Sequence, residues 1–560
     1  MLPSCYLFAG IMDDISALKV LFIEPNANVR SSLQDIFTQW GVTQIDHVMR
    51  ASAAITLLQK KQFDIVLCEF DLTEGQDGQQ LLEDLREHRL LPLTTLFLMV
   101  TAERDQGRVI STVELGPTEY LLKPFTAGFL VERLERALEK RVAFKPAYVA
   151  IDHGDLQEAI ACCERGETLS RRYALDFRFL RADLHLRQGQ LAQAESIYAQ
   201  LAETKAAEAA RLGLAKVWRM QNRMREAEEM LTALLEKNRK LWEAYDCLAE
   251  VLEADGRSEE AKQVLKEAVE LSPHTVRRLR KLGRLALETG DIETALPAYH
   301  EVVDKMRYSR FREPEDYVHL VRSLLGTGNP AQADAAVHEL SKARIDFKKT
   351  EACSSLSYAL IDEFNGELER AQEQLTTAIG AYNNNAGLSH EVKLVLAQSC
   401  LNNGMEDNAA EIILDIMNNA SGDAARAKAV AILERAGRTD LINSLAEKSK
   451  QYMVDLLAAC QVKIEKADYR GAVDLMTHAA HQMSDNPEVA LNAASVMLTC
   501  IGNTGWNDEL GAQAYRYIEN ARRLDPAHPR LPDMLDVYRG TLKKYSIPFK
   551  HVSAKSRVRV

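Results

Sequence analysis

The chain has 560 residues, which is too many for a single hydrophobic core, so at least two domains are expected. A formal net charge of −12 argues against broad contact with nucleic acid or an anionic membrane, because both require a basic face. The nine cysteines form no C-x-x-C pair, which excludes a recognisable zinc site or disulfide framework and favours a reducing cytoplasm.

Residues 1–17 are predicted to be an N-terminal leader. The apolar stretch "MLPSCYLFAGI" lacks a preceding basic region, and Asp13 and Asp14 follow it at once, so the pattern does not favour a signal peptide. No later stretch approaches the roughly 18 uninterrupted apolar residues of a membrane span. A cytoplasmic protein without a membrane partner is therefore expected.

Residues 18–141 alternate short apolar runs with helical patterns. The apolar runs are "LKVLFIE", "QIDHVM", "FDIVLCEF", "TTLFLMVTA" and "EYLLKP", and amphipathic stretches such as "VRSSLQDIFTQW" and "AGFLVERLERALEK" separate or follow them. Such alternation predicts an α/β domain with a doubly wound parallel sheet covered on both faces.

Polar residues stand where four of these predicted strands end. They are Glu24 after the first strand, Glu69 after the third, Thr101 after the fourth and Lys123 after the fifth. In a doubly wound sheet, function collects outside the carboxyl ends of the strands. The four side chains are therefore expected to converge on one edge.

This region resembles a two-component response-regulator receiver, a domain with a flavodoxin-like fold. The resemblance rests on "VLFIEPNANVR", "DIVLCEFDLTEGQDGQQLL", "MVTAE" and "YLLKPF". In that family an acidic pair after the first strand and an aspartate after the third hold magnesium, and the aspartate accepts a phosphoryl group. The resemblance implies that Thr101 and Lys123 bind phosphoryl oxygens and that Tyr120 is the aromatic residue that turns inward on activation.

The departures from the family pattern lie where its chemistry takes place. Glu24 and Pro25 stand in place of the acidic pair, so Glu24 is a remnant of the acidic pocket and Pro25 offers no side-chain ligand. Because magnesium requires several oxygen ligands in near-octahedral geometry, no metal site and no cofactor are expected, beyond weak binding of Mg²⁺ at most.

The phosphoacceptor position carries Glu69. Asp71 is the alternative, because the loop before Asp77 and Gly78 is one residue longer than usual for the family, but "DIVLCE" aligns with the third strand without a gap and favours Glu69. Glu69 would place a fixed negative charge where a phosphoaspartate carries its own, paired with Lys123. The alternative interpretation is a site that has lost its function and keeps only this ion pair.

Beyond residue 141 the strand patterns give way to an internal repeat. A Gly or Asn, four variable residues and an Ala recur at separations of 35, 33, 34, 34, 38, 38 and 38 residues. The eight copies begin at Gly154, Gly189, Asn222, Gly256, Gly290, Gly328, Gly366 and Gly404. Fixed periods of this length predict an all-α solenoid over residues 142–540.

The repeats resemble tetratricopeptide repeats, most fully over residues 242–275. Tyr245, Leu248, Ala249 and Leu252 fit the first helix of that motif, and Ala261, Leu265, Ala268 and Pro273 fit the second helix and its end. Small residues at these positions allow paired helices to approach closely, and the turn glycine is expected to end the first helix in a left-handed conformation. The superhelical groove of such repeats binds a partner protein or peptide.

Residues 541–560 are predicted to be a basic C-terminal tail. They follow an acidic chain and include Lys543, Lys544, Lys550, Lys555, Arg557 and Arg559. A solvated tail is favoured over a docking segment.

Together these patterns predict a bacterial signalling adaptor without enzymatic activity, in which a receiver-like domain regulates or positions a solenoid that binds a partner. A histidine kinase or another signalling protein is the candidate partner at the receiver. The main alternative is a working response regulator whose solenoid is switched by phosphotransfer. A nucleic-acid-binding regulator is not favoured, because the chain lacks a basic stripe outside the tail.

Overall fold

The computed structural model describes residues 15–73, 75–343, 346–384, 386–419, 423–526 and 528–547. Most of the predicted leader and of the basic tail lies outside the described residues. The chain forms two compact units. The first comprises Met1–Leu186 and Leu191–Ser323, and the second comprises Arg187–Gln190 and Leu324–Val560.

The first unit begins with a parallel sheet, which in the described residues has five strands in the order β2-β1-β3-β4-β5. The strands are β1 (Lys19–Ile23), β2 (Gln44–Val48), β3 (Ile65–Cys68), β4 (Leu96–Thr101) and β5 (Glu119–Leu122). In register, Val20 pairs with Ile65, and Ile65 pairs with Leu96. The carboxyl ends of β1, β3 and β4 therefore lie side by side.

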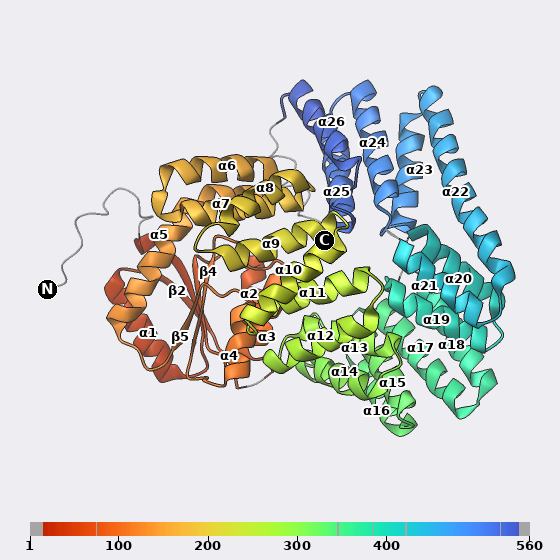
Figure 1. The fold of residues 1–560 in the computed structure, drawn as a ribbon, viewed down its shortest axis with the longest axis horizontal. Helices are drawn as coiled ribbons and strands as arrows, with labels where there is room; N and C mark the ends of the chain where they lie inside the picture. The colour runs from red at the N-terminus through yellow and green to blue at the C-terminus, as the bar shows by residue number, and fades with distance from the viewer. Residues whose placement is uncertain are drawn as a thin grey trace. The chain divides into compact units, whose positions relative to one another are not determined.

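Helices cover both faces of this sheet (Figure 1). They are α1 (Ala27–Trp40), α2 (Ala51–Lys60), α3 (Gly78–Glu87), α4 (Gln106–Glu114) and α5 (Ala127–Asp152). Alternate residues of β1 point to opposite faces, so Leu21 packs with α2 and α3 whereas Phe22 packs with α1 and α5. The predicted doubly wound α/β fold is confirmed.

Local capping explains where several of these helices begin. The side chains of Asn26, Asp105 and Thr126 accept backbone hydrogen bonds at the starts of α1, α4 and α5. Asp77 and Gln80 form a reciprocal capping box at the start of α3. Four of the five helices that follow the carboxyl ends of the strands, α1, α3, α4 and α5, thus start at a side-chain cap close to that edge.

Helix α5 continues from the sheet domain into the helical region. It extends through residue 141, the predicted border between the domains, and its second half packs against α6 (Leu156–Leu169). Both core clusters of the sheet domain nevertheless consist of buried residues from Leu18 to Leu138. The border at residue 141 stays a prediction.

The rest of the first unit consists of paired helices. They are α7 (Ala174–Arg187), α8 (Leu191–Ala202), α9 (Ala207–Met220), α10 (Met224–Lys237), α11 (Trp242–Ala254), α12 (Ser258–Leu271), α13 (Val276–Glu288), α14 (Ile292–Met306) and α15 (Pro314–Gly326). Two short 3-10 turns, Ile15–Ala17 and Arg171–Tyr173, complete it. The predicted solenoid is confirmed here.

The second unit continues the same arrangement. Its helices are α16 (Pro330–Lys342), α17 (Phe347–Asn365), α18 (Leu368–Asn383), α19 (His390–Asn402), α20 (Glu406–Asn419), α21 (Asp423–Arg435), α22 (Thr439–Glu465), α23 (Tyr469–Gln482), α24 (Pro487–Thr504), α25 (Asp508–Leu524) and α26 (Leu531–Lys544). The long helix α22 lies beyond the last of the eight copies of the repeat, which begins at Gly404.

The repeat motif has a direct structural counterpart. The first residue of all eight copies has a positive φ between 61° and 79°, which ends the first helix of each pair as predicted. The alanine that closes each copy is fully buried between helices; these residues are Ala159, Ala194, Ala227, Ala261, Ala295, Ala333, Ala371 and Ala409. Small size at that position lets the paired helices pack closely.

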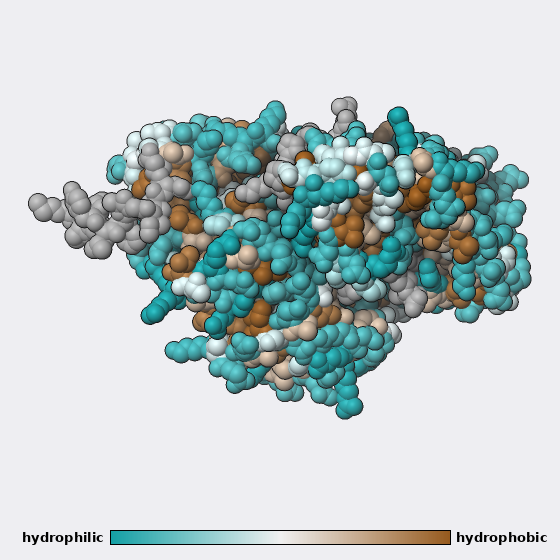
Figure 2. Space-filling model, turned by 90° about the horizontal axis from the view of Figure 1, so that it is seen from above, coloured by the Kyte–Doolittle hydropathy of each residue, from teal (hydrophilic) through white to brown (hydrophobic). Residues whose placement is uncertain are grey.

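The face shown in Figure 2 is mainly hydrophilic. Hydrophobic residues emerge as separate patches between hydrophilic ones on the visible face (Figure 2). Among the described residues, no helix combines the length and the hydropathy that a membrane crossing requires.

Candidate functional site

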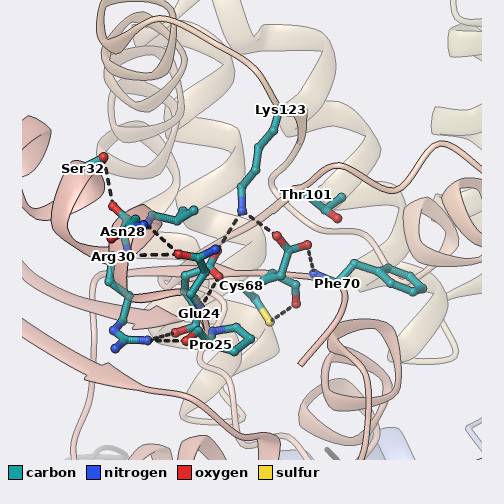
Figure 3. A network of polar contacts seen from close by, with 12 residues as sticks. Glu24, Pro25, Asn28, Arg30, Ser32, Cys68, Phe70, Thr101 and Lys123 are labelled. Carbon is teal, nitrogen blue, oxygen red and sulfur yellow. Dashed lines mark hydrogen bonds and ion pairs between the residues drawn. The ribbon is translucent and has the colours of Figure 1, made fainter. Parts of the chain in front are cut away.

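Three side chains predicted to converge are in direct contact at the carboxyl edge of the sheet. Lys123, directly after β5, donates from Nζ to Glu24 Oε2 at 2.8 Å and to Glu69 Oε2 at 2.5 Å. Figure 3 shows the Lys123 side chain pointing toward Glu24. The side chains are 21%, 5% and 13% exposed for Lys123, Glu24 and Glu69. One ammonium group is thus shared by two nearly buried carboxylates, which leaves a net negative charge.

The second oxygen of each carboxylate is bound locally. Glu24 Oε1 accepts a hydrogen bond from the backbone N–H of Asn26 at 2.9 Å, and Glu69 Oε1 accepts one from the N–H of Phe70 at 2.7 Å. Charge-assisted bonds of this kind are stronger than neutral ones. Both carboxylates are therefore fixed by one backbone donor and one ammonium donor each.

This arrangement raises the pKa of Lys123. Partial burial of the ammonium group lowers that pKa, but the hydrogen bonds and the charges of Glu24 and Glu69 outweigh the burial. Lys123 is therefore a permanently charged centre of the site at neutral pH.

The β1–α1 loop is fixed by a residue that the sequence analysis did not single out. The Arg30 guanidinium donates to the carbonyl oxygens of Glu24 and Pro25 at 2.7 and 2.8 Å. These bonds hold the loop through its backbone and add no acceptor side chain to the site. An arginine seven residues beyond the end of a strand carries no spacing signal that could have identified it.

Asp71, the alternative acceptor, lies apart from this cluster. Its side chain is exposed and accepts a hydrogen bond from the backbone N–H of Thr73 at 2.9 Å, which makes a local turn. Glu69 instead directly follows β3, where its N–H donates to the Ile23 carbonyl at 2.9 Å. The structure thus brings Glu69, and not Asp71, to Lys123.

Thr101 and Tyr120 lie on the same edge but bind a neighbouring loop. The Thr101 hydroxyl accepts from the N–H of Glu103 at 3.0 Å, and the Tyr120 hydroxyl donates to the Glu103 carbonyl at 3.4 Å. Burial, followed by the charges of Glu103 and Glu69, raises the pKa of Tyr120 to about 12. The proposed sensing roles of both residues stay predictions.

The loop between Glu69 and α3 closes tightly on itself. The N–H of Gly78 donates to the Phe70 carbonyl at 2.7 Å, and a Cβ at position 78 would lie 2.3 Å from the Glu69 carbonyl oxygen. Only glycine fits so close an approach. Cys68 is fully buried beneath this loop, and burial, with the charge of Glu69 second, raises the pKa of its thiol.

The donor set does not fit the magnesium ion that a receiver fold implies. Pro25 offers no side-chain oxygen, and the Lys123 ammonium already occupies the space between the two carboxylates. Among the described residues, no three His, Cys, Asp or Glu side chains are grouped as metal ligands. A hard divalent cation would have to displace Lys123 and would still lack oxygen ligands.

Comparison with protein families agrees with the two parts of the fold. Residues 20–135 match the model described as the response regulator receiver domain. Residues 185–249 and 247–307 match two models described as tetratricopeptide repeats. The two parts identified by their motifs are therefore confirmed.

Two relatives match the first part of the chain. The chain is 28% identical over 126 residues to chemotaxis protein CheY-3 of Vibrio cholerae serotype O1, which spans 22% of this chain and 93% of that protein. Chemotaxis protein CheY of Pseudomonas aeruginosa is 28% identical over 124 residues, 22% of this chain and 98% of that protein.

Solved structures resemble each part separately. Vibrio cholerae CheY4 aligns with a TM-score of 0.20 and 22% identity, covering 21% of this chain and 98% of that one. A tetratricopeptide repeat protein from Parabacteroides merdae aligns with a TM-score of 0.30 and 18% identity, covering 46% of this chain and 97% of that one.

Proposed function

We propose that this chain, which joins a response regulator receiver domain to tetratricopeptide repeats, is a bacterial signalling adaptor without enzymatic activity. Its receiver is a pseudo-receiver that carries a fixed charge at Glu69 in place of a phosphoryl group. The repeats bind a partner protein or peptide, and the receiver regulates or positions them.

The shared ammonium of Lys123 is the observation that supports this proposal most strongly. Glu69 presents a carboxylate at the end of β3, 2.5 Å from the lysine that would contact a phosphoryl oxygen in a working receiver. Glu24 binds the same ammonium at 2.8 Å. An anion is thus already present where signalling would otherwise create one.

The same geometry argues against phosphoryl transfer. Transfer depends on neutralising charge with metal ions and on holding donor and acceptor in line. Here the metal ligands are incomplete at Pro25, and Glu69 is one methylene longer than the aspartate of the family. We therefore assign no phosphoryl step to these residues.

The repeats supply the output of the proposed adaptor. Their regular helix pairs create the extended surfaces that repeat proteins use to hold peptides or helices. A histidine kinase or another signalling protein is the candidate partner at the receiver. Affinity purification from the native host, with the full chain and with a chain lacking the repeats, would identify what the repeats hold.

A phosphorylation assay tests the proposal. The full chain is incubated with acetyl phosphate and Mg²⁺, and its intact mass is measured under mild conditions. We expect the unmodified mass for the natural chain and also for Glu69→Asp, because the metal ligands remain incomplete. A labile phosphoryl adduct on the natural chain, at Asp71 or elsewhere, would establish the working response regulator instead.

A further inference from the structure

Two loops that join successive repeats bind the receiver. The 272–275 loop connects α12 to α13, and the 307–313 loop connects α14 to α15. Both belong to the same compact unit as the receiver. Their hydrogen bonds and their ring contact fall on α2, α3, α4 and the residue after α3. Tyr308 also approaches the loop that follows Glu69, since a Cβ at Gly75 would lie 3.8 Å from the Tyr308 Cβ.

The 272–275 loop binds α3 and α4 through polar side chains. Its contacts are Gln79 Nε2 to the His274 carbonyl at 3.1 Å, Ser111 Oγ to Ser272 Oγ at 2.8 Å, and Thr275 Oγ1 to Glu114 Oε2 at 2.9 Å. Arg278, in the first turn of α13, adds an ion pair with Glu114 at 3.2 Å. The side chains of Arg278 and Glu114 are only 1% and 3% exposed, so this is a buried interface.

The 307–313 loop binds α2 and α3. Its contacts are Ser309 Oγ to Asp84 Oδ2 at 2.7 Å, Arg310 Nη1 to Thr56 Oγ1 at 3.1 Å, and the Phe311 ring stacked on His88 with centroids 3.8 Å apart. Asp84 is 1% exposed and Ser309 is 2% exposed. The Asp84–Ser309 hydrogen bond therefore lies at the buried centre of this contact.

Asp84 also binds the loop that begins at Glu69. Gln76, within that loop, donates from Nε2 to the same Asp84 oxygen at 2.7 Å, and Gln76 is 3% exposed. One carboxylate oxygen thus accepts a donor from the receiver loop and a donor from the repeats. Gln76 and Ser309 therefore share one acceptor oxygen of Asp84.

Glu69 holds the other end of this loop. Its Oε1 accepts from the N–H of Phe70, the Phe70 carbonyl accepts from the N–H of Gly78, and Gly78 is the first residue of α3. The contacts therefore run without interruption from the Glu69 carboxylate to the start of α3, and through Gln76 and Asp84 to Ser309.

We propose that α3 couples the site at Glu69 to the repeats, with Asp84 as the positioning residue that transmits the state of the 69–78 loop to the 307–313 loop. This inference rests on the proposed function, because it assumes a fixed charge at Glu69 and assigns to that charge an effect on the contact between α3 and the repeats. Loss of that charge weakens the contacts of the 69–78 loop, then those at the start of α3. It then weakens the bond from Asp84 to the loop that joins α14 to α15.

Hydrogen–deuterium exchange on the full chain tests the coupling. Glu69→Gln offers one acceptor oxygen in place of two and cannot serve both Phe70 and Lys123. We expect exchange at least about fivefold faster than in the natural chain, both in the 69–78 loop and in the 307–313 loop. Faster exchange in the 69–78 loop alone would overturn the proposal.

Two comparison variants define the route. Glu24→Gln also removes one carboxylate that binds Lys123. Glu24 is bonded to the β1–α1 loop and not to the 69–78 loop, so the 307–313 loop should keep its natural exchange rate. Glu119→Gln, at an ion pair with Arg133 in β5 and α5, should leave both loops unchanged. If Glu24→Gln accelerated exchange in the 307–313 loop as much as Glu69→Gln does, no route through α3 would be needed, and the proposed coupling would be overturned.

Ser309→Ala tests the coupling from the opposite end. Because coupling between two sites is reciprocal, removing the donor to Asp84 should accelerate exchange in the 69–78 loop. No change there would contradict the proposal even if Glu69→Gln fails to fold. The exchange experiment uses no phosphate donor, so its outcome is independent of whether acetyl phosphate modifies the chain.

Discussion

Acidic residues are largely buried at two places in the receiver domain: at the carboxyl edge of its sheet, and on the surface of α3 and α4 that contacts the repeats, called here the α3–α4 face. Their surroundings differ. At the edge, Glu24 and Glu69 each have a backbone donor and share the Lys123 ammonium. On the α3–α4 face, Glu83 and Asp84 are buried beneath the repeats with fewer charged partners, and burial raises the pKa of both carboxyls.

The difference shows how the surroundings of a carboxylate decide its role. At the edge, each carboxylate accepts a hydrogen bond from a backbone N–H and one from the Lys123 ammonium. At the α3–α4 face, the charge costs free energy once the repeats exclude water. The edge therefore differs from the α3–α4 face in how its carboxyls are solvated and bonded.

Breaking the buried ion pair of the α3–α4 face should have the largest effect. Arg278→Ala leaves Glu114 buried without its cation, which typically costs about 3–5 kcal/mol. The free energy of unfolding of the first unit, measured by urea denaturation, should fall by roughly this amount. Arg278 also binds Asp246 at 2.8 Å, so Asp246 loses the closer of its two arginine partners.

The neighbouring Arg277 supplies a matched control for this variant. Its side chain is 77% exposed and lies 3.6 Å from Asp246. Arg277→Ala should change the free energy of unfolding by about 0.5 kcal/mol or less, as expected for an exposed ion pair. Similar losses in the two variants would contradict a buried receiver–repeat interface.

Glu83 should make the stability of the first unit depend on pH. Burial raises the pKa of Glu83 from 4.5 to about 7. The Arg277 N–H and the charge of Arg280 lower this pKa, whereas the charges of Glu87 and Asp84 raise it further. Its Oε2 has no hydrogen-bond partner among the described residues. The folded unit therefore binds the Glu83 proton more tightly than the unfolded chain does.

The sign of the dependence follows from this difference in proton binding. Below pH 4.5 Glu83 is neutral in both states, and as the pH rises toward 7 the folded state loses stability relative to the unfolded state. Glu83→Gln should raise the free energy of unfolding at pH 8 by about 2–3 kcal/mol and leave it nearly unchanged at pH 4.5. Denaturation at both pH values measures this, with Glu132→Gln as an exposed control. An equal effect of Glu83→Gln at the two pH values would exclude titration of Glu83.

The residues of the carboxyl edge could be predicted from the sequence because the pattern that marks them is local. Apolar runs that end on Glu24, Glu69 and Lys123 mark both the strands and the residues that follow them, and strand ends in a parallel sheet must meet. The solenoid could be predicted for a similar reason. The first residue of each repeat ends a helix with a positive φ, and the alanine packs between helices.

The receiver–repeat interface could not be predicted in this way. Asp84 and Ser309 are 225 residues apart and meet through a single hydrogen bond, which leaves no periodic pattern in either segment. Gln76 and Arg278 likewise belong to segments whose local sequence only indicates a loop and a helix start. Contacts of this kind depend on how the repeats are placed against the receiver, which the sequence pattern does not encode locally.

The affinity of the full chain for the partner held by its repeats tests the fixed charge at Glu69 most directly. The natural chain, Glu69→Gln and Glu69→Asp are compared with acetyl phosphate and Mg²⁺ present and absent. We expect Glu69→Gln to weaken binding by about 1–3 kcal/mol and acetyl phosphate to change none of the three affinities. Equal affinity of the natural and Gln chains, or a phosphate-dependent gain in the natural chain, would contradict a fixed charge at Glu69.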